Sequence, residues 1–137
     1  ALSIGERRVR EIMVPREEGV ALSLEKSVEE NLRVAGENPH SRFPLADGSL
    51  SRVVGKIYVP SLLRNRDALE EGKKNLEDLA APPVSVSAES SISQLIDRLQ
   101  EEGQELALVK ENGKTCGLVT VTDAFEAITG EVKDPLD

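Results

Sequence analysis

The sequence is short of cysteine, aromatic side chains and positive charge. Cys116 is the only cysteine in 137 residues, so no internal disulfide can form, which favours a reducing compartment. There is no Trp, and the aromatic side chains are Phe43, Tyr58 and Phe125, so the core must be aliphatic. Lys and Arg number 17 against 25 Asp and Glu, for a formal net charge of −8. Because such a surface repels polyanions, we expect no nucleic-acid partner.

Several functional signatures are missing as well. No apolar run approaches the roughly 20 residues of a membrane helix and no signal-peptide pattern occurs, so we expect a soluble domain. His40 has no second His or Cys nearby, which argues against a transition-metal site. The sequence has no Walker loop, no Gly-x-Ser-x-Gly and no paired base and nucleophile, so we expect no catalytic residue and no enzyme. Since the chain starts at Ala1 rather than Met, we expect it to belong to a longer protein.

The two halves of the chain repeat one pattern of residue types. Residues of the first half recur in the second in the same order, at an offset that shrinks stepwise, as short loop deletions would make it. The pairs are Val9 with Leu76, Ile12 with Leu79, Pro15 with Pro82, Ser27 with Ser91, Val28 with Ile92, Leu32 with Ile96, Leu45 with Val109, Gly55 with Gly117 and Ser61 with Asp123. The chain therefore consists of two copies of one unit.

Each copy predicts a short helical turn followed by the order β-α-β-β-α. Ser27 with Glu30 and Ser91 with Gln94 match the capping box that starts a helix. Asp47-Gly48 and Asn112-Gly113 predict tight hairpin turns, because these residues tolerate positive φ. The predicted elements are helical turns at Val9–Met13 and Leu76–Ala80, strands at Val20–Leu24 and Val84–Val86, hairpin strands at Phe43–Ala46, Val53–Val59, Leu106–Lys110 and Gly117–Val121, and last helices that begin at Ser61 and near Thr122 or Asp123.

The fold class predicted from this pattern is mixed α/β. One copy of about sixty residues has a sheet with one face to cover and is marginally stable alone. Two β-α-β-β-α modules packed sheet to sheet as a pseudo-twofold pair remove that difficulty. The predicted boundaries are 1–64 for the first module, 65–75 for a charged, partly helical linker, and 76–137 for the second module with its C-terminal tail.

A known family shares these features. The string Gly117-Leu118-Val119-Thr120-Val121-Thr122-Asp123, leading into the last helix of a duplicated β-α-β-β-α unit, resembles the CBS-domain pair. Four further segments resemble the CorC/hemolysin-C and CNNM group within that superfamily. They are RVREIMVPR (Arg8 to Arg16), SRFPL (Ser41 to Leu45), VGKIYVPSLL (Val54 to Leu63) and EAITGEVKD (Glu126 to Asp134).

The resemblance implies a function. In that family the CBS pair lies on the cytosolic side of a transmembrane domain implicated in the export of Mg²⁺, Co²⁺ or other divalent cations. It therefore implies a regulatory domain of a longer membrane protein, attached to a transmembrane domain on the cytoplasmic side. It further implies a homodimer formed through the CBS modules and an adenine nucleotide ligand, ATP or AMP, with or without Mg²⁺. Such a ligand would favour one arrangement of the modules or of the chains.

One candidate ligand site lies in the second module. Asp123, at the start of the last helix, is suited to accept hydrogen bonds from the two ribose hydroxyls of a nucleotide. Thr120 offers a hydroxyl to ribose or phosphate, and the free N–H groups of the helix start attract an anion. By resemblance, Pro83, Val84 and Ala107 would form the adenine slot. By a weaker resemblance, Arg42 would reach the phosphates.

Other interpretations of these residues remain open. Asp123 can serve only as a helix cap, Thr120 only as a strand residue, and Arg42 only as a surface or ion-paired arginine. The first module has Pro60-Ser61 where the family commonly has Lys-Asp, so we expect no nucleotide there. In the second module the turn Glu111-Asn112-Gly113-Lys114 lacks the usual aromatic residue, and Thr122 stands where Glu is frequent. A structural dimerisation module without ligand is therefore the alternative function.

Overall fold

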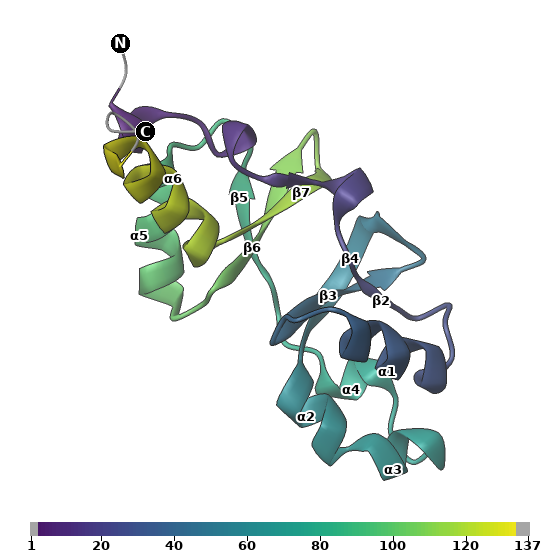
Figure 1. Cartoon of the computed structure of the whole chain (residues 1–137). Helices are drawn as coiled ribbons and strands as arrows, with labels where there is room; N and C mark the ends of the chain where they lie inside the picture. The colour runs from purple at the N-terminus through teal and green to yellow at the C-terminus, as the bar shows by residue number, and fades with distance from the viewer. Residues whose placement is uncertain (1–2, 134–137) are drawn as a thin grey trace. The chain divides into compact units, whose positions relative to one another are not determined.

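The structure is a computed structural model in which residues 3–133 are described (Figure 1). The chain folds into two compact units. The central unit comprises Val20–Pro83, and the terminal unit combines Ala1–Gly19 with Val84–Asp137. Across the described residues, no helix combines the length and the apolar character needed to cross a bilayer.

The central unit is a three-stranded sheet with helices. The strands have the order β2-β3-β4, with β2 parallel to β3 and β3 antiparallel to β4. Its elements are β2 (Leu22–Ser23), α1 (Val28–Glu37), β3 (Arg42–Asp47), β4 (Ser49–Tyr58), α2 (Val59–Arg64), α3 (Arg66–Glu70) and α4 (Leu76–Leu79). The buried cluster is aliphatic apart from one phenylalanine and consists of Leu22, Phe43, Leu45, Ile57, Leu62, Leu69 and Leu76.

A capping box and a buried amide fix helix α1 beside its strand. The Ser27 hydroxyl accepts a hydrogen bond from the Glu30 backbone N–H at 3.1 Å, as the sequence predicts. The fully buried Asn31 side chain accepts from the Ser23 N–H and donates to the Ser23 carbonyl, each at 2.9 Å. The backbone of Ser23 is therefore satisfied by a side chain, and this pair joins α1 to the end of β2.

The terminal unit is built on a four-stranded sheet of order β1-β7-β6-β5. Strands β5 and β6 are parallel, while β7 is antiparallel to both of its neighbours. Its elements are 3-10 turns η1 (Ile4–Glu6), η2 (Val9–Glu11) and η3 (Arg16–Glu18), strands β1 (Val14–Pro15), β5 (Val84–Ser87), β6 (Leu106–Glu111) and β7 (Lys114–Thr120), and helices α5 (Ile92–Glu102) and α6 (Val121–Lys133).

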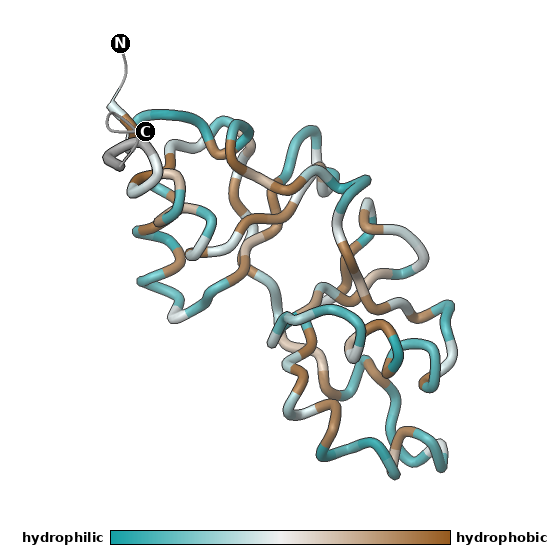
Figure 2. Tube along the Cα trace, in the orientation of Figure 1, coloured by the Kyte–Doolittle hydropathy of each residue, from teal (hydrophilic) through white to brown (hydrophobic). Residues whose placement is uncertain are grey.

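The core of the terminal unit joins residues from both ends of the sequence. Val9 is fully buried in one cluster with Val84, Val86, Ala88, Ile92, Leu95, Leu99, Ala107, Val109, Val119 and Ala124. Figure 2 shows the apolar stretches along the strands of this unit. Helix α5 begins at the capping box of Ser91 with Gln94. It ends at Gly103, which adopts the left-handed conformation with a φ of 62°. The β6–β7 turn uses Asn112 and Gly113 at φ of 53° and 76°, as the sequence predicts.

The mixed α/β class and the repeated β-α-β-β-α order are confirmed. Helix α2 begins at Val59, two residues before the predicted Ser61, and α6 begins at Val121, directly before the predicted region near Thr122 or Asp123. In α2 a proline occupies the first turn, where its missing N–H costs nothing, so the helix starts before the serine. In α6 the cap is Thr120, three residues before Asp123.

The units are discontinuous in sequence, whereas the expected division into 1–64, 65–75 and 76–137 is contiguous. The leading turn of the first copy, Val9–Glu11, lies in the terminal unit with the second copy's sheet, and α4 lies in the central unit. The stretch expected as a partly helical linker contains α3, and Leu69 within it is 4% exposed in the central core. Helix α3 is therefore part of the packed central unit, whereas residues 71–75 are exposed.

Candidate functional site

Thr120 and Asp123 form a reciprocal pair where β7 passes into α6. The Thr120 backbone N–H donates to Asp123 Oδ2 at 2.9 Å, and the Asp123 backbone N–H donates to Thr120 Oγ1 at 3.1 Å. Both residues are half-buried. The pair satisfies two backbone donors of the helix start and fixes the orientation of the carboxylate. Because the Thr120 hydroxyl oxygen accepts this bond, its own proton remains available to a further acceptor.

Val84 and Ala107 lie at the same end of the strands as Thr120. Val84 begins β5 and pairs with Ala107 on β6, while Leu106 pairs with Thr120 at the end of β7. Val84 is 5% exposed and Ala107 is fully buried. The predicted apolar residues and the predicted polar pair therefore meet at one end of three adjacent strands.

The other two predicted site residues belong to the central unit. Pro83 is its last residue, directly before Val84, and is half-buried. Arg42 begins β3, and its guanidinium lies 4.7 Å from the centroid of the Tyr58 ring. Arg42 and Tyr58 are directly opposite each other in the β3–β4 pairing, so the contact is a cross-strand cation–π interaction.

The equivalent position in the first copy lacks this chemistry. Helix α2 has Tyr58 at its N-cap, and no side chain caps its first turn. Ser61, which corresponds to Asp123 in the repeat, carries no carboxylate. The reciprocal pairing of Thr120 with Asp123 therefore has no counterpart at the start of α2.

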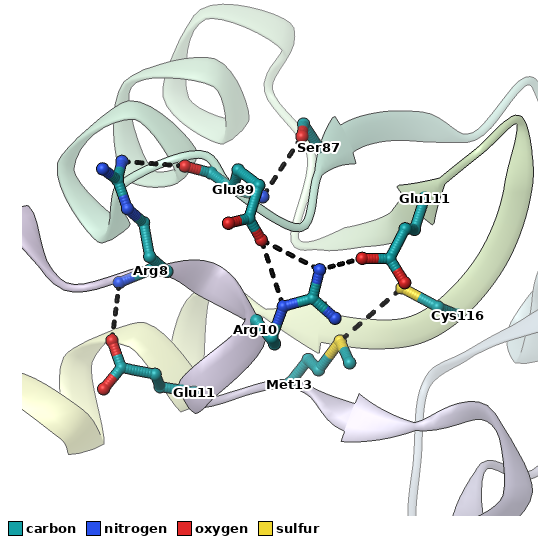
Figure 3. A network of polar contacts seen from close by, with 8 residues as sticks. All are labelled: Arg8, Arg10, Glu11, Met13, Ser87, Glu89, Glu111 and Cys116. Carbon is teal, nitrogen blue, oxygen red and sulfur yellow. Dashed lines mark hydrogen bonds and ion pairs between the residues drawn. The ribbon is translucent and has the colours of Figure 1, made fainter.

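An arginine-centred network in the terminal unit was not predicted from sequence (Figure 3). Arg10 donates from Nε and Nη2 to Glu89 Oε2, at 3.0 and 2.9 Å, and also from Nη2 to Glu111 Oε2. These hydrogen bonds raise the pKa of Arg10, with the bond to Glu111 contributing most, and the same bond lowers the pKa of Glu111. A hydrogen bond from the Arg8 backbone N–H likewise lowers the pKa of Glu11. The two partners of Arg10 are 79 and 101 residues away from it in sequence, so no local sequence pattern indicates these contacts.

A metal site is not found among the described residues. Within residues 3–133, no three His, Cys, Asp or Glu side chains gather in a way that could hold a metal ion. The family-like segment Glu126 to Asp134 ends at Asp134, which lies outside the described residues.

Comparison with known proteins finds similarity to CBS domains both in sequence and in structure. The CBS domain family matches residues 76–130 of this chain. A solved CBS domain from Clostridium difficile 630 has a TM-score of 0.83 at 30% identity, over 95% of this chain and 99% of that one. The CBS domain of the bacterial CNNM/CorC family Mg²⁺ transporter, solved in complex with ATP, has a TM-score of 0.83 at 33% identity, over 93% of this chain and 90% of that one.

The curated relatives are longer proteins. The magnesium and cobalt efflux protein CorC of Buchnera aphidicola is 30% identical over 99% of this chain and 47% of its own length. This chain spans less than half of the length of each of the first curated relatives it matches. The match accordingly concerns one part of such proteins.

Proposed function

Because this chain belongs to the CBS-domain family, as a CBS pair of the CNNM/CorC transporter type, we propose that it regulates a divalent-cation transporter by binding an adenine nucleotide. The nucleotide site is a single one, in the second module, at Thr120 and Asp123. The observation that supports it best is the reciprocal pairing of these two residues at the start of α6. The ATP complex of a relative that is 33% identical gives independent support.

The residues present fit a nucleoside. Asp123 uses Oδ2 for the Thr120 N–H, which leaves Oδ1 and a second lone pair of Oδ2 for the two vicinal hydroxyls of a ribose. Hydrogen bonds to a charged carboxylate contribute about 1.5–3 kcal/mol each. The fixed orientation of the carboxylate reduces the entropy that binding would otherwise cost.

The rest of the ligand is assigned by its chemistry. Val84, Ala107 and Pro83 offer apolar surface for adenine, and the Thr120 hydroxyl with the first turn of α6 offers donors for an anionic phosphate. Arg42, in the central unit, is carried over for the more distant phosphates by the family resemblance alone. ATP carries these phosphates as a Mg²⁺ complex, so the proposed ligand is ATP·Mg²⁺, with AMP as the smaller alternative.

The transporter context is also a proposal. This chain covers less than half of the efflux protein that it resembles, so the remainder of such a protein would supply the membrane-spanning part. The CBS pair would then lie on the cytoplasmic side. Nucleotide would act by binding one arrangement of the pair more tightly than another, and its effect is limited by that difference in affinity.

A homodimer is proposed on a specific observation. Leu63 on α2 and Phe125 on α6 occupy equivalent positions of the two copies, and they are 59% and 49% exposed. Two large apolar side chains at equivalent positions suit a symmetric contact with a second copy. The same proposed contact would also serve the alternative function, a structural dimerisation module without ligand.

Calorimetry tests the nucleotide site. Wild type is titrated with ATP in the presence and absence of Mg²⁺, with AMP and with S-adenosylmethionine, and so are Asp123→Ala and Ser27→Ala. Ser27→Ala is the matched control, because it removes the side-chain cap of a helix, α1, that does not belong to the candidate site. We expect wild type and Ser27→Ala to bind ATP equally and Asp123→Ala to bind at least tenfold more weakly, a loss of about 1.4 kcal/mol. No binding to wild type, or equal binding by Asp123→Ala, would overturn the site.

A further inference from the structure

The first residues of the chain form a strap on the second module. The N-terminal strap is Ile4–Pro15, which contains η1, η2 and β1. Its backbone is bonded to the loop before α5: the Val9 N–H donates to the Ser90 carbonyl at 2.8 Å, and the Arg10 N–H donates to the Ala88 carbonyl at 3.1 Å. In the other direction, the Ile92 N–H donates to the Arg7 carbonyl at 2.9 Å. These bonds join segments about eighty residues apart in sequence.

Side chains hold the strap at two further places. Val9 is fully buried in the core of the terminal unit, and Arg10 binds Glu89 and Glu111 on the surface (Figure 3). The β-sheet adds a third attachment, because Val14 and Pro15 pair with Leu118 and Gly117. The purple N-terminal segment can be followed beside β7 in Figure 1.

At Gly117 the strap and the sheet leave no room for a side chain. A Cβ atom at Gly117 would lie 2.5 Å from Met13 Sδ and 2.8 Å from the Val14 carbonyl oxygen. The second of these atoms belongs to the backbone and cannot rotate away. Any side chain at this position therefore forces the strap or β7 to shift.

Strap and candidate site share a strand. Gly117 and Leu118 bind the strap through the edge of β7, and the same strand ends at Thr120, whose backbone N–H is bonded to Asp123. Val119, between them, is fully buried in the cluster that contains Val9 from the strap. The position of Thr120 thus depends on a strand that the strap flanks on one edge and β6 on the other.

We propose that the strap is a ligand-responsive element: nucleotide at Thr120 and Asp123 stabilises it on β7, and without nucleotide it opens more often. The proposal rests on the proposed function and names the segment whose conformation responds to nucleotide binding. The two states are strap bound and strap released, the second reached by local opening of short 3-10 turns without unfolding of the helices. Nucleotide binds only the first state, so by linkage it suppresses the second.

Hydrogen exchange measures the opening directly. The amides of Val9 and Arg10 report on the strap, and the amide of Leu95, which donates to the Ser91 carbonyl inside α5, reports on the core. Without ligand, the strap amides should exchange faster than Leu95. With ATP·Mg²⁺ at one hundred times its Kd, strap exchange should slow by at least tenfold, up to the roughly hundredfold limit set by mass action.

Two variants open the strap without touching the site. Arg10→Gln removes the ion pairs to Glu89 and Glu111 and should speed strap exchange in the free protein. Its matched control is Arg66→Gln, which removes the exposed pair with Glu70 in the central unit and should leave strap exchange unchanged. Gly117→Ala should lower ATP affinity at least tenfold, whereas Gly36→Ala, with no atom within 4 Å of the new methyl group, should not.

The outcomes separate this proposal from the function on which it rests. Absence of ATP binding to wild type would overturn the proposed function and the strap proposal together. ATP binding with strap exchange unchanged by ligand, or strap amides that exchange no faster than Leu95, would overturn the strap proposal alone. If Gly117→Ala does not fold, as judged by circular dichroism, the exchange data on wild type and Arg10→Gln decide the question.

Discussion

The carboxylate of Asp123 and the backbone N–H of Thr120 are joined by a hydrogen bond of 2.9 Å, and the Asp123 N–H returns a bond to Thr120 Oγ1 at 3.1 Å. The same reciprocal geometry starts α1 at Ser27–Glu30 and α5 at Ser91–Gln94. A helix cap alone therefore explains why these two residue types stand three apart. This pair differs from the other two in its position, because it lies at the end of the strands where Val84 and Ala107 also lie.

The capping role predicts coupled effects on stability. Thr120→Val and Asp123→Ala should each lower the free energy of unfolding by about 1 kcal/mol, because each removes a partner of the same reciprocal pair. The double variant should lose less than the sum of the two, with an interaction energy of about 0.5 kcal/mol or more. Urea unfolding of the four proteins measures this cycle. Strict additivity would show that the two bonds stabilise the start of α6 independently and would contradict the predicted coupling.

The sequence predicts best what is encoded locally. The capping boxes at Ser27 and Ser91 and the Asn112-Gly113 turn depend on residues within four positions of one another, and all three are found in the structure. The pairing of Val84 with Ala107 followed from the repeat, because a β-α-β unit brings its two strands side by side. These signals were enough for the class of fold and for the end of the sheet where the candidate site lies.

Contacts between distant segments had no such signal. Strand β1 has only two residues, and its partner Gly117 lies about one hundred positions later, so no periodicity marks it. The ion pairs of Arg10 were hidden for the same reason. The repeat correctly matched Val9 with Leu76 as leading residues, but it could not show that Val9 packs beside the second copy's strands.

The ion pair of Arg10 with Glu111 predicts an effect of pH on stability. The pKa of Glu111 is lower in the folded protein than its usual value of 4.5. A lowered carboxyl pKa adds stability at pH values above the unfolded pKa, and this contribution is lost as pH falls through the folded pKa. Glu111→Gln should therefore be less stable than wild type near neutral pH, and the difference should narrow below about pH 4.5.

Denaturant midpoints at pH 7 and at about pH 3.5 test this effect. The control is the same Glu111→Gln change in an Arg10→Gln background, where the cause of the lowered pKa is gone. There the effect of the Glu111 change should depend much less on pH. An equal pH dependence in both backgrounds would contradict the assignment to Arg10.

A glycine pair predicts opposite effects of one methyl group. Gly55 on β4 has no room, since a Cβ would lie 2.7 Å from Ala80 Cβ and 3.2 Å from the Ala81 carbonyl oxygen. Gly55→Ala should lower the free energy of unfolding by about 1–3 kcal/mol through overpacking. Gly36→Ala in α1, with nothing within 4 Å, should raise it by about 0.5–1 kcal/mol because alanine favours the helix. Thermal and urea unfolding compare them, and similar effects of both changes would contradict the packing at Gly55.

The exposed pair Leu63 and Phe125 predicts a change in assembly. If these side chains lie in a symmetric contact with a second copy, Leu63→Glu and Phe125→Glu should each convert a dimer to a monomer, because a charge would be buried without a partner. Analytical ultracentrifugation measures the mass directly. Val54→Glu is the matched control, since Val54 is 48% exposed on β4 and outside both helices. A wild-type monomer at all concentrations, or dissociation by the control as well, would exclude this contact.

Thr115 on β7 carries a buried hydroxyl to which the described part of the chain offers no hydrogen bond. The residue is fully buried, and its Oγ1 has no hydrogen-bond partner among the described residues, although its carbonyl accepts from Arg16 Nη1 at 3.0 Å. An unsatisfied buried hydroxyl costs about 1–3 kcal/mol, so an apolar group of the same shape should be tolerated or preferred. Thr115→Val should therefore leave the free energy of unfolding unchanged or raise it by about 1 kcal/mol. Thr115→Ser, which keeps the hydroxyl and loses the methyl group, should lower it by about 1 kcal/mol, as urea unfolding will show. Destabilisation by valine greater than that by serine would mean that the hydroxyl is hydrogen-bonded in solution.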